Sequence, residues 1–154
     1  MANVNEIVEA AKRLHDQKDE AGLELLIGMR TMAIEKNPAL GDNIEFEPVY
    51  SAQTMGMLDD VKALGKRILS RWNKELYSLV CVNEDDDQKD RRAILGALNL
   101  GEAAVIGAVA TALLTLGVAA AIAAALAPLI VKRFIWPAKD ELCQAWGEGV
   151  KARG

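Results

Sequence analysis

The chain has 154 residues, of which 51% are hydrophobic and 26% charged, and its formal net charge at pH 7 is −4. This length fits one domain, and the composition is that of an average globular protein. The acidic balance argues against nucleic-acid binding, because phosphate contacts need a concentrated basic surface. Cys81 and Cys143 are too few for a disulfide scaffold, and their spacing matches no zinc motif, so we expect two unpaired, buried thiols in a reducing cytoplasm.

Residues 1–37 predict a pair of helices. The first covers 3–19, with apolar side chains at helical spacing and Asn3 or Asn5 available as its N-cap. The second covers 20–36 and ends there because the next proline restricts the residue before it to extended backbone. The first 20 residues hold many charges and no apolar stretch typical of a signal peptide, so we expect a cytoplasmic protein, with membrane association as the alternative.

Residues 38–51 contain two prolines and a glycine and predict an irregular connector whose apolar side chains pack beneath the helices. Residues 52–82 predict the clearest amphipathic helix. Its expected apolar stripe consists of Val61, Leu64, Ile68, Trp72, Leu76 and Leu79. Five cations occupy much of its remaining surface: Lys62, Lys66, Arg67, Arg71 and Lys74. This basic face fits an anionic partner or a plane of lipid headgroups, although an ordinary solvated face shows the same pattern.

Residues 86–136 predict apolar helices. The first of them ends near Leu98 or Leu100, where Gly101 can adopt a positive φ at little cost. From Ala103 to Val131 there are 29 consecutive residues without a charge, and 12 of them are alanine. Gly117 divides this run into two helices, 102–116 and 118–136. The large apolar residues that we expect to face the core or the membrane include Val109, Leu113, Leu116, Ile122, Leu126 and Ile130. Residues 137–154 predict a short helix and a polar tail that frays.

The uncharged run 103–131 allows two interpretations. Its length is sufficient to cross a bilayer, which takes about 20 residues. Alanine adds little hydrophobic drive, however, and the preceding amphipathic helices need an apolar partner. The most buried helix of a bundle is apolar all round. We therefore predict a single all-α domain over 1–154, a compact bundle of about six to seven helices with an alanine-rich central hairpin, and keep membrane contact as the alternative.

No motif for catalysis, cofactor or metal binding is found in the sequence. His15 is the only histidine and lies among charged residues, which favours a solvated side chain. The acidic cluster 83–87 lacks the ligand spacing of an EF-hand, and no P-loop or dinucleotide motif occurs. We predict a non-enzymatic interaction protein, an adaptor or accessory subunit, that binds a protein partner through the basic face or the 38–51 loop, with an oligomer also compatible. The alternative is a membrane-inserting or membrane-anchored effector that uses 103–131.

Overall fold

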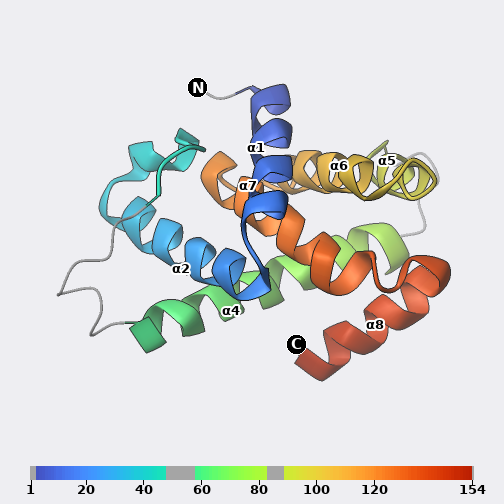
Figure 1. The fold of residues 1–154 in the computed structure, drawn as a ribbon. Helices are drawn as coiled ribbons and strands as arrows, with labels where there is room; N and C mark the ends of the chain where they lie inside the picture. Colours follow the sequence, from blue (N-terminus) through green and yellow to red (C-terminus); the bar gives the residue numbers. More distant parts are fainter. Residues whose placement is uncertain (1–2, 48–57, 83–88, 154) are drawn as a thin grey trace.

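The computed structural model describes residues 3–47, 58–82 and 89–153. These ranges form an all-α bundle without strands, which confirms the predicted fold class (Figure 1). The α-helices are α1 (Val4–Gln17), α2 (Glu20–Lys36), α4 (Leu58–Tyr77), α5 (Lys89–Ala97), α6 (Glu102–Thr115), α7 (Ala120–Ile130) and α8 (Leu142–Arg153). Shorter turns connect them: 3₁₀ helices η1 (Pro38–Asp42) and η4 (Lys139–Glu141), and π turns η2 (Ser78–Val82) and η3 (Val131–Ile135).

Local capping signals set the ends of the N-terminal helix pair. The Asn3 side chain accepts a hydrogen bond from the backbone N–H of Glu6 at 2.9 Å, and Asp19 caps α2 in the same way at the N–H of Gly22. An N-cap of this kind satisfies a backbone donor that the first turn of a helix leaves free. The observed ranges of α1 and α2 agree with the predicted ones to within two residues at each end.

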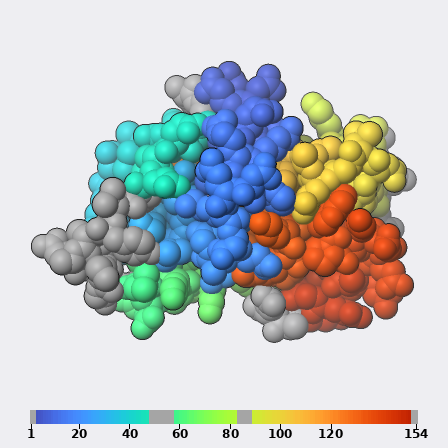
Figure 2. Space-filling view, in the orientation of Figure 1, coloured from blue at the N-terminus to red at the C-terminus, as the bar shows by residue number. Residues whose placement is uncertain are grey.

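Helix α7 is the centre of the molecule, and every one of its residues is buried. Helices α1, α2 and α6 pack against it, and in the space-filling view the blue atoms of α1 and α2 cover the middle of one face (Figure 2). Small alanine side chains suit this position because they let neighbouring helices approach closely. Within the described residues no single helix is both long and apolar enough to cross a bilayer. One bent pair, Ala120–Ile135 and Lys139–Lys151 at 74°, meets that criterion only when its helices are taken together.

The turn between α6 and α7 follows the prediction at Gly117. This glycine has a φ of +99°, and its N–H donates to the carbonyl of Leu114 at 3.0 Å. The N–H of Val118 donates to the carbonyl of Leu113, also at 3.0 Å. Two such bonds around a glycine with positive φ form a Schellman motif, which satisfies the last carbonyls of α6 and turns the chain back toward α7. Gly101 also has a positive φ, but it precedes α6 as its N-cap instead of directly ending α5.

The buried face of α4 differs from the predicted apolar stripe. It comprises Val61, Gly65, Leu69, Asn73 and Leu76, whereas Leu64, Ile68 and Trp72 are only half-buried. The cause is the close crossing of α2 and α4. A Cβ atom built on Gly65 would lie 2.2 Å from the carbonyl oxygen of Glu24, and one on Gly28 would lie 2.2 Å from that of Val61. The two backbones therefore touch, and α4 turns its glycine toward α2 in place of a larger side chain.

Two expectations for the C-terminal region are wrong. The predicted fraying tail is part of α8, which continues to Arg153 and packs against α4 and η3. The predicted unpaired, buried thiols are instead a disulfide between Cys81 and Cys143, with their Cα atoms 5.5 Å apart, and Cys143 is exposed. The indole of Trp146 explains why α8 docks. It is 1% exposed and meets the Tyr77 ring edge-on, with 5.6 Å between ring centroids.

Candidate interaction surface on helix α4

The five predicted cations of α4 are all exposed. Their spacing divides them into two rows, because residues four positions apart lie on the same side of a helix. The first row is Lys62, Lys66, Ser70 and Lys74. The second row is Arg67 and Arg71. The basic face is therefore two neighbouring surfaces, one beside α8 and η3 and one turned away from the bundle.

The arginine row is a solvent-facing surface. No acidic side chain in the described part of the chain pairs with Arg67 or Arg71, and the same holds for Lys62 and Lys66. The Arg71 guanidinium instead lies over the half-buried ring of Trp72, 4.7 Å from its centroid. Cation–π contact of this kind orients a guanidinium while its N–H groups stay available to an acceptor.

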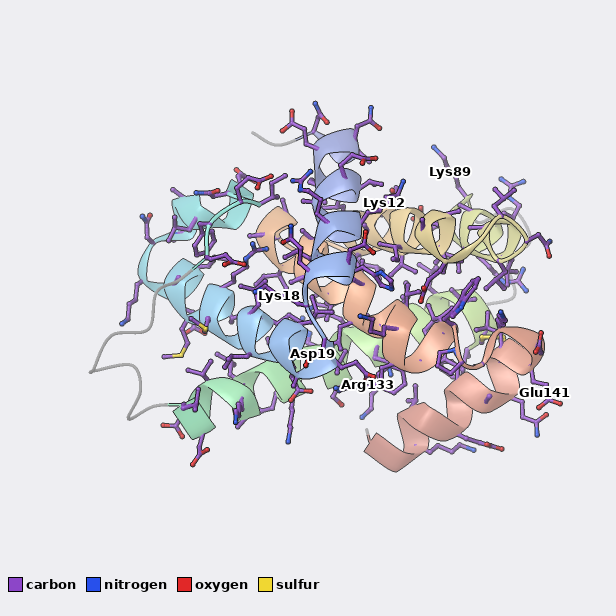
Figure 3. All side chains as sticks on the ribbon, viewed as in Figure 1. Lys12, Lys18, Asp19, Lys89, Arg133 and Glu141 are labelled. Atoms are coloured by element: carbon purple, nitrogen blue, oxygen red, sulfur yellow. A yellow bond between two sulfur atoms is a disulfide. The ribbon has the colours of Figure 1, made fainter. Side chains whose placement is uncertain are left out.

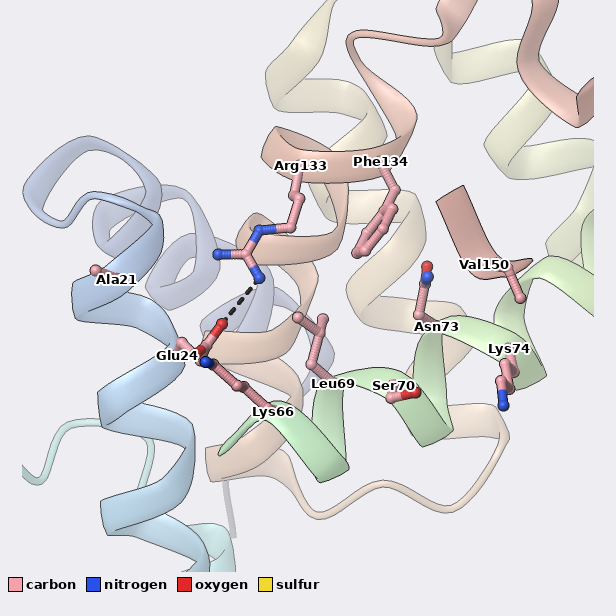
Figure 4. Close-up of a pocket in the computed structure, with 10 residues that line it drawn as sticks. All are labelled: Ala21, Glu24, Lys66, Leu69, Ser70, Asn73, Lys74, Arg133, Phe134 and Val150. Carbon is pink, nitrogen blue, oxygen red and sulfur yellow. Dashed lines mark hydrogen bonds and ion pairs between the residues drawn. The ribbon is translucent and has the colours of Figure 1, made fainter. Parts of the chain in front are cut away.

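The lysine row borders a pocket of about 520 Å³ between α2, α4, η3 and α8 (Figure 4). Helix α4 supplies the lower wall in that view, with η3 above it, α2 at one end and α8 at the other. The lining residues are Ala21, Glu24, Lys66, Leu69, Ser70, Asn73, Lys74, Arg133, Phe134 and Val150. Sequence reasoning placed Lys66 and Lys74 on a helix surface, but it could not find the pocket, which is formed by segments up to 129 positions apart in the chain.

Asn73 is a polar side chain that the core encloses, being 3% exposed. Its Oδ1 accepts a hydrogen bond from the indole Nε1 of Trp146 at 2.7 Å. Because an indole N–H can only donate, the oxygen of the amide must face Trp146 and the NH₂ group must point elsewhere. That NH₂ group has no acceptor among the described residues, and Asn73 lines the pocket.

Arg133 joins the pocket to the start of α2. Its Nε donates to Glu20 Oε1 at 2.6 Å and its Nη1 to Glu24 Oε2 at 2.8 Å. Burial alone would lower the pKa of Arg133, but the hydrogen bonds and charges of the two carboxylates raise it above its usual value. Figure 3 shows Arg133 beside the start of α2, near Asp19. The acidic group in the pocket wall, Glu24, is therefore already paired with a cation.

A second buried cation, Arg30, fixes the described part of the 38–51 connector. It is 1% exposed and donates to the backbone carbonyls of Ile44, Phe46 and Ala121 at 2.8 to 3.2 Å. Burial lowers its pKa to about 10, with Glu47 and Glu45 acting in the opposite direction, so it stays charged at neutral pH. No pattern in the sequence marked Arg30. The predicted packing is observed for Ile44, whereas Phe46 is only half-buried, and Val49 and Tyr50 lie outside the described residues.

His15 is not the solvated side chain that we predicted. Its side chain is 18% exposed, and its Nε2 atom is buried 3.3 Å from Glu102 Oε1, though not in hydrogen-bond geometry. Nearby, the Nζ of Lys132 donates to the carbonyls of His15 and Lys18, at 3.2 Å each. A cation at these last carbonyls stabilises the negative end of α1. His15 is thus part of the contact between α1, α6 and η3.

Of the six hairpin residues that we predicted for the core, Leu116 is only half-buried. The buried ones are Val109, Leu113, Ile122, Leu126 and Ile130. Among the described residues no group of three His, Cys, Asp or Glu side chains could hold a metal ion. The acidic cluster 83–87 falls outside the described ranges.

In comparisons with known proteins, no family model, no curated protein and no solved structure matches this chain. The function must therefore be argued from the two surfaces of α4.

Proposed function

We propose that this protein is a non-enzymatic interaction protein, an adaptor or accessory subunit, that binds an acidic segment of a partner protein through Arg67 and Arg71. The observation that carries the proposal is that both side chains are exposed and without an acidic partner in the described chain. Acidic residues are the complement of such a surface. Arginine forms planar, paired hydrogen bonds with carboxylates and is enriched at protein interfaces.

The rigidity of α4 supports this choice of surface. Its opposite face lies against α2 in backbone contact at Gly65, and the disulfide at Cys81 links the turn after it to α8. A binding surface on a fixed helix loses little conformational entropy when a partner docks. The other predicted docking segment, 38–51, is less suitable, because Arg30 holds the carbonyls of Ile44 and Phe46 toward the interior.

The test uses a charge reversal with a matched control. The double variant Arg67→Glu and Arg71→Glu should lose binding to proteins that the wild type retains from cells of its source. The control, Lys89→Glu and Lys151→Glu, changes the net charge equally at two other exposed positions and should keep binding. A captured protein supports the proposal only if lysines placed at its own acidic residues restore binding to the arginine-reversed variant. Equal binding by both double variants would overturn the proposal.

The wild type and the arginine-reversed variant can also be used to test the membrane alternative. Insertion of 103–131 would require α7 to leave the helices that bury it. We expect wild-type protein to stay in the bottom fraction when mixed with vesicles of phosphatidylcholine and phosphatidylglycerol and centrifuged in a density gradient, at pH 7 and at pH 5. Flotation that persists in the arginine-reversed variant would contradict a protein-only role and favour insertion of the apolar hairpin.

A further inference from the structure

We propose that the acidic partner segment that binds α4 is an amphipathic helix whose charged residues follow a fixed order. This inference rests on the proposed function and deepens it, since it concerns the same arginine row. The docking proposal requires only that acidic residues lie opposite Arg67 and Arg71. The side chains beside these two arginines also specify what the rest of the partner segment must carry.

A third charge continues the arginine row. Glu75 follows Arg71 by four positions, is exposed, and forms no ion pair among the described residues. Arg71 does not neutralise it, because the Arg71 guanidinium lies over the Trp72 ring. An arginine four positions before a glutamate is also the less favourable order for an ion pair within a helix. The row therefore reads positive, positive, negative, at intervals of about 6 Å along the helix axis.

A row of apolar side chains runs beside the charged row. It consists of Leu64, Ile68 and Trp72, and each of them precedes a member of the charged row by three positions. Residues three positions apart are neighbours on a helix surface, so the two rows lie side by side. All three side chains are half-buried, and the last two pack against the core. Their exposed parts are apolar surface that a partner would cover when its carboxylates reach the arginines.

Two adjacent rows favour a helical partner over an extended one. An extended segment turns alternate side chains to opposite sides, so only one row of them faces α4. A helix presents neighbouring rows with the same four-residue interval as α4, so its charged row and its apolar row meet both rows together. The partner helix then carries two acidic residues four positions apart, a basic residue at the next such interval, and large apolar residues in the row beside them.

A second copy of this chain does not supply that complement. The complement needs two acidic residues and one basic residue, whereas the row on α4 has two basic residues and one acidic residue. Reversing the direction of the second copy leaves this count unchanged. The charges therefore favour a different protein as the occupant of this face.

Synthetic peptides of about 20 residues, long enough to form a helix, test the pattern on the full-length protein. The matched peptide has an alanine-rich sequence with Glu, Glu and Lys at four-residue spacing and leucines in the adjacent row. The permuted control has the same composition but the order Glu, Lys, Glu, which mismatches α4 in either direction of the peptide. The broken control keeps the matched order and has two central alanines replaced by proline, which disrupts a helix.

Fluorescence anisotropy of dye-labelled peptides measures the affinities. The matched peptide should bind at least about tenfold more tightly than either control, because an exposed ion pair is worth up to about fivefold and the permuted order loses two. Equal affinities for the matched and the broken peptides would overturn the helical partner, and equal affinities for the matched and the permuted peptides would overturn the charge order. A dissociation constant of the matched peptide above about 1 mM would also overturn the inference.

Glu75→Lys tests this inference separately from the docking proposal. It should weaken binding of the matched peptide about fivefold and strengthen binding of a peptide with Glu at all three charged positions. The matched control Glu35→Lys makes the same charge change at an exposed position of α2 and should alter neither affinity. Unchanged binding in Glu75→Lys would overturn the inference and leave the docking proposal intact, whereas the Arg67→Glu and Arg71→Glu variant tests the docking proposal itself.

Analytical ultracentrifugation tests the second copy as an occupant. We expect the wild type and the arginine-reversed variant to sediment with the same molecular mass. A dimer of the wild type that the arginine-reversed variant does not form would assign this face to a second copy and overturn the inference.

Discussion

Arg30 is the residue on which the described part of the connector depends. Its guanidinium reaches three backbone carbonyls in two separate segments, Ile44 and Phe46 in the connector and Ala121 at the start of α7. It also lies 5.4 Å from the centroid of the Phe46 ring. A buried charge is costly unless hydrogen bonds replace its hydration, and here the carbonyls do so. One side chain therefore ties η1 and its continuation to the central helix.

We predict that Arg30→Met destabilises the protein by about 2–4 kcal/mol, because three buried carbonyls lose charged donors, each worth roughly 1.5–3 kcal/mol and not additive. The matched control is Arg13→Met, which removes an exposed ion pair with Glu45 and should cost less than about 1 kcal/mol. Urea unfolding followed by circular dichroism measures both free energies. Similar losses for the two variants would show that the buried carbonyls do not depend on Arg30.

At the scale of the elements, the crossing of α2 and α4 depends on two glycines in backbone contact. Gly65→Ala should destabilise the protein by about 1–3 kcal/mol, because the added methyl would overlap the Glu24 carbonyl and force the helices apart. Gly96→Ala is the matched control on α5. Its new Cβ meets no atom within 4 Å, so the better helix propensity of alanine should stabilise the protein by about 0.5 kcal/mol. The midpoint of thermal unfolding should fall in Gly65→Ala and rise in Gly96→Ala. A shift of both midpoints in the same direction would contradict a tight crossing of α2 and α4.

The elements that could be predicted are those with local signals. Asn3, Pro38 and Gly117 each act on the backbone within a few residues of themselves, so the ends of α1, α2 and α6 were readable from the chain. Burial of α7 was also readable, because a helix that is apolar on every side needs protein or lipid around it. These features depend on short-range geometry and on composition, which a sequence contains in full.

The elements that could not be predicted depend on distant partners. The amphipathic pattern of α4 favoured its largest apolar residues, whereas contact with α2 selected Gly65. The predicted apolar stripe did not include Asn73, which is buried because its oxygen accepts a hydrogen bond from Trp146, 73 residues later. The glycines of the tail suggested fraying, but Gly147 and Gly149 leave space for Tyr77 and Phe134. For the same reason the five basic residues of α4 could be named from the sequence, while the pocket beside Lys66 and Lys74 could not be predicted.

In the molecule as a whole, helix α7 lies in the core and helix α8 lies at the outside. Helix α7 is enclosed by α1, α2 and α6, whereas α8 packs on α4 and on the turns η3 and η4. Its attachment relies on Trp146 and on the disulfide from Cys81 to Cys143. Val150 of α8 is one of the residues that line the pocket, so detachment of this helix would remove part of the pocket wall.

The disulfide should therefore stabilise α8 more than it stabilises the core. It joins residues 62 positions apart, and a cross-link of that span stabilises a folded chain by up to about 4 kcal/mol by restricting its unfolded state. We predict that the double variant Cys81→Ser and Cys143→Ser loses about 2–4 kcal/mol of unfolding free energy. Its amides in 142–153 should exchange with deuterium faster by a larger factor than those in 120–130.

Reducing agent should have the same effect on the wild type and none on the double variant, which serves as its control. The disulfide would be contradicted if wild-type protein, unfolded without reducing agent, had free thiols at both cysteines. Equal acceleration of exchange in α7 and α8 would instead indicate that the molecule unfolds as one unit and that α8 has no separate attachment.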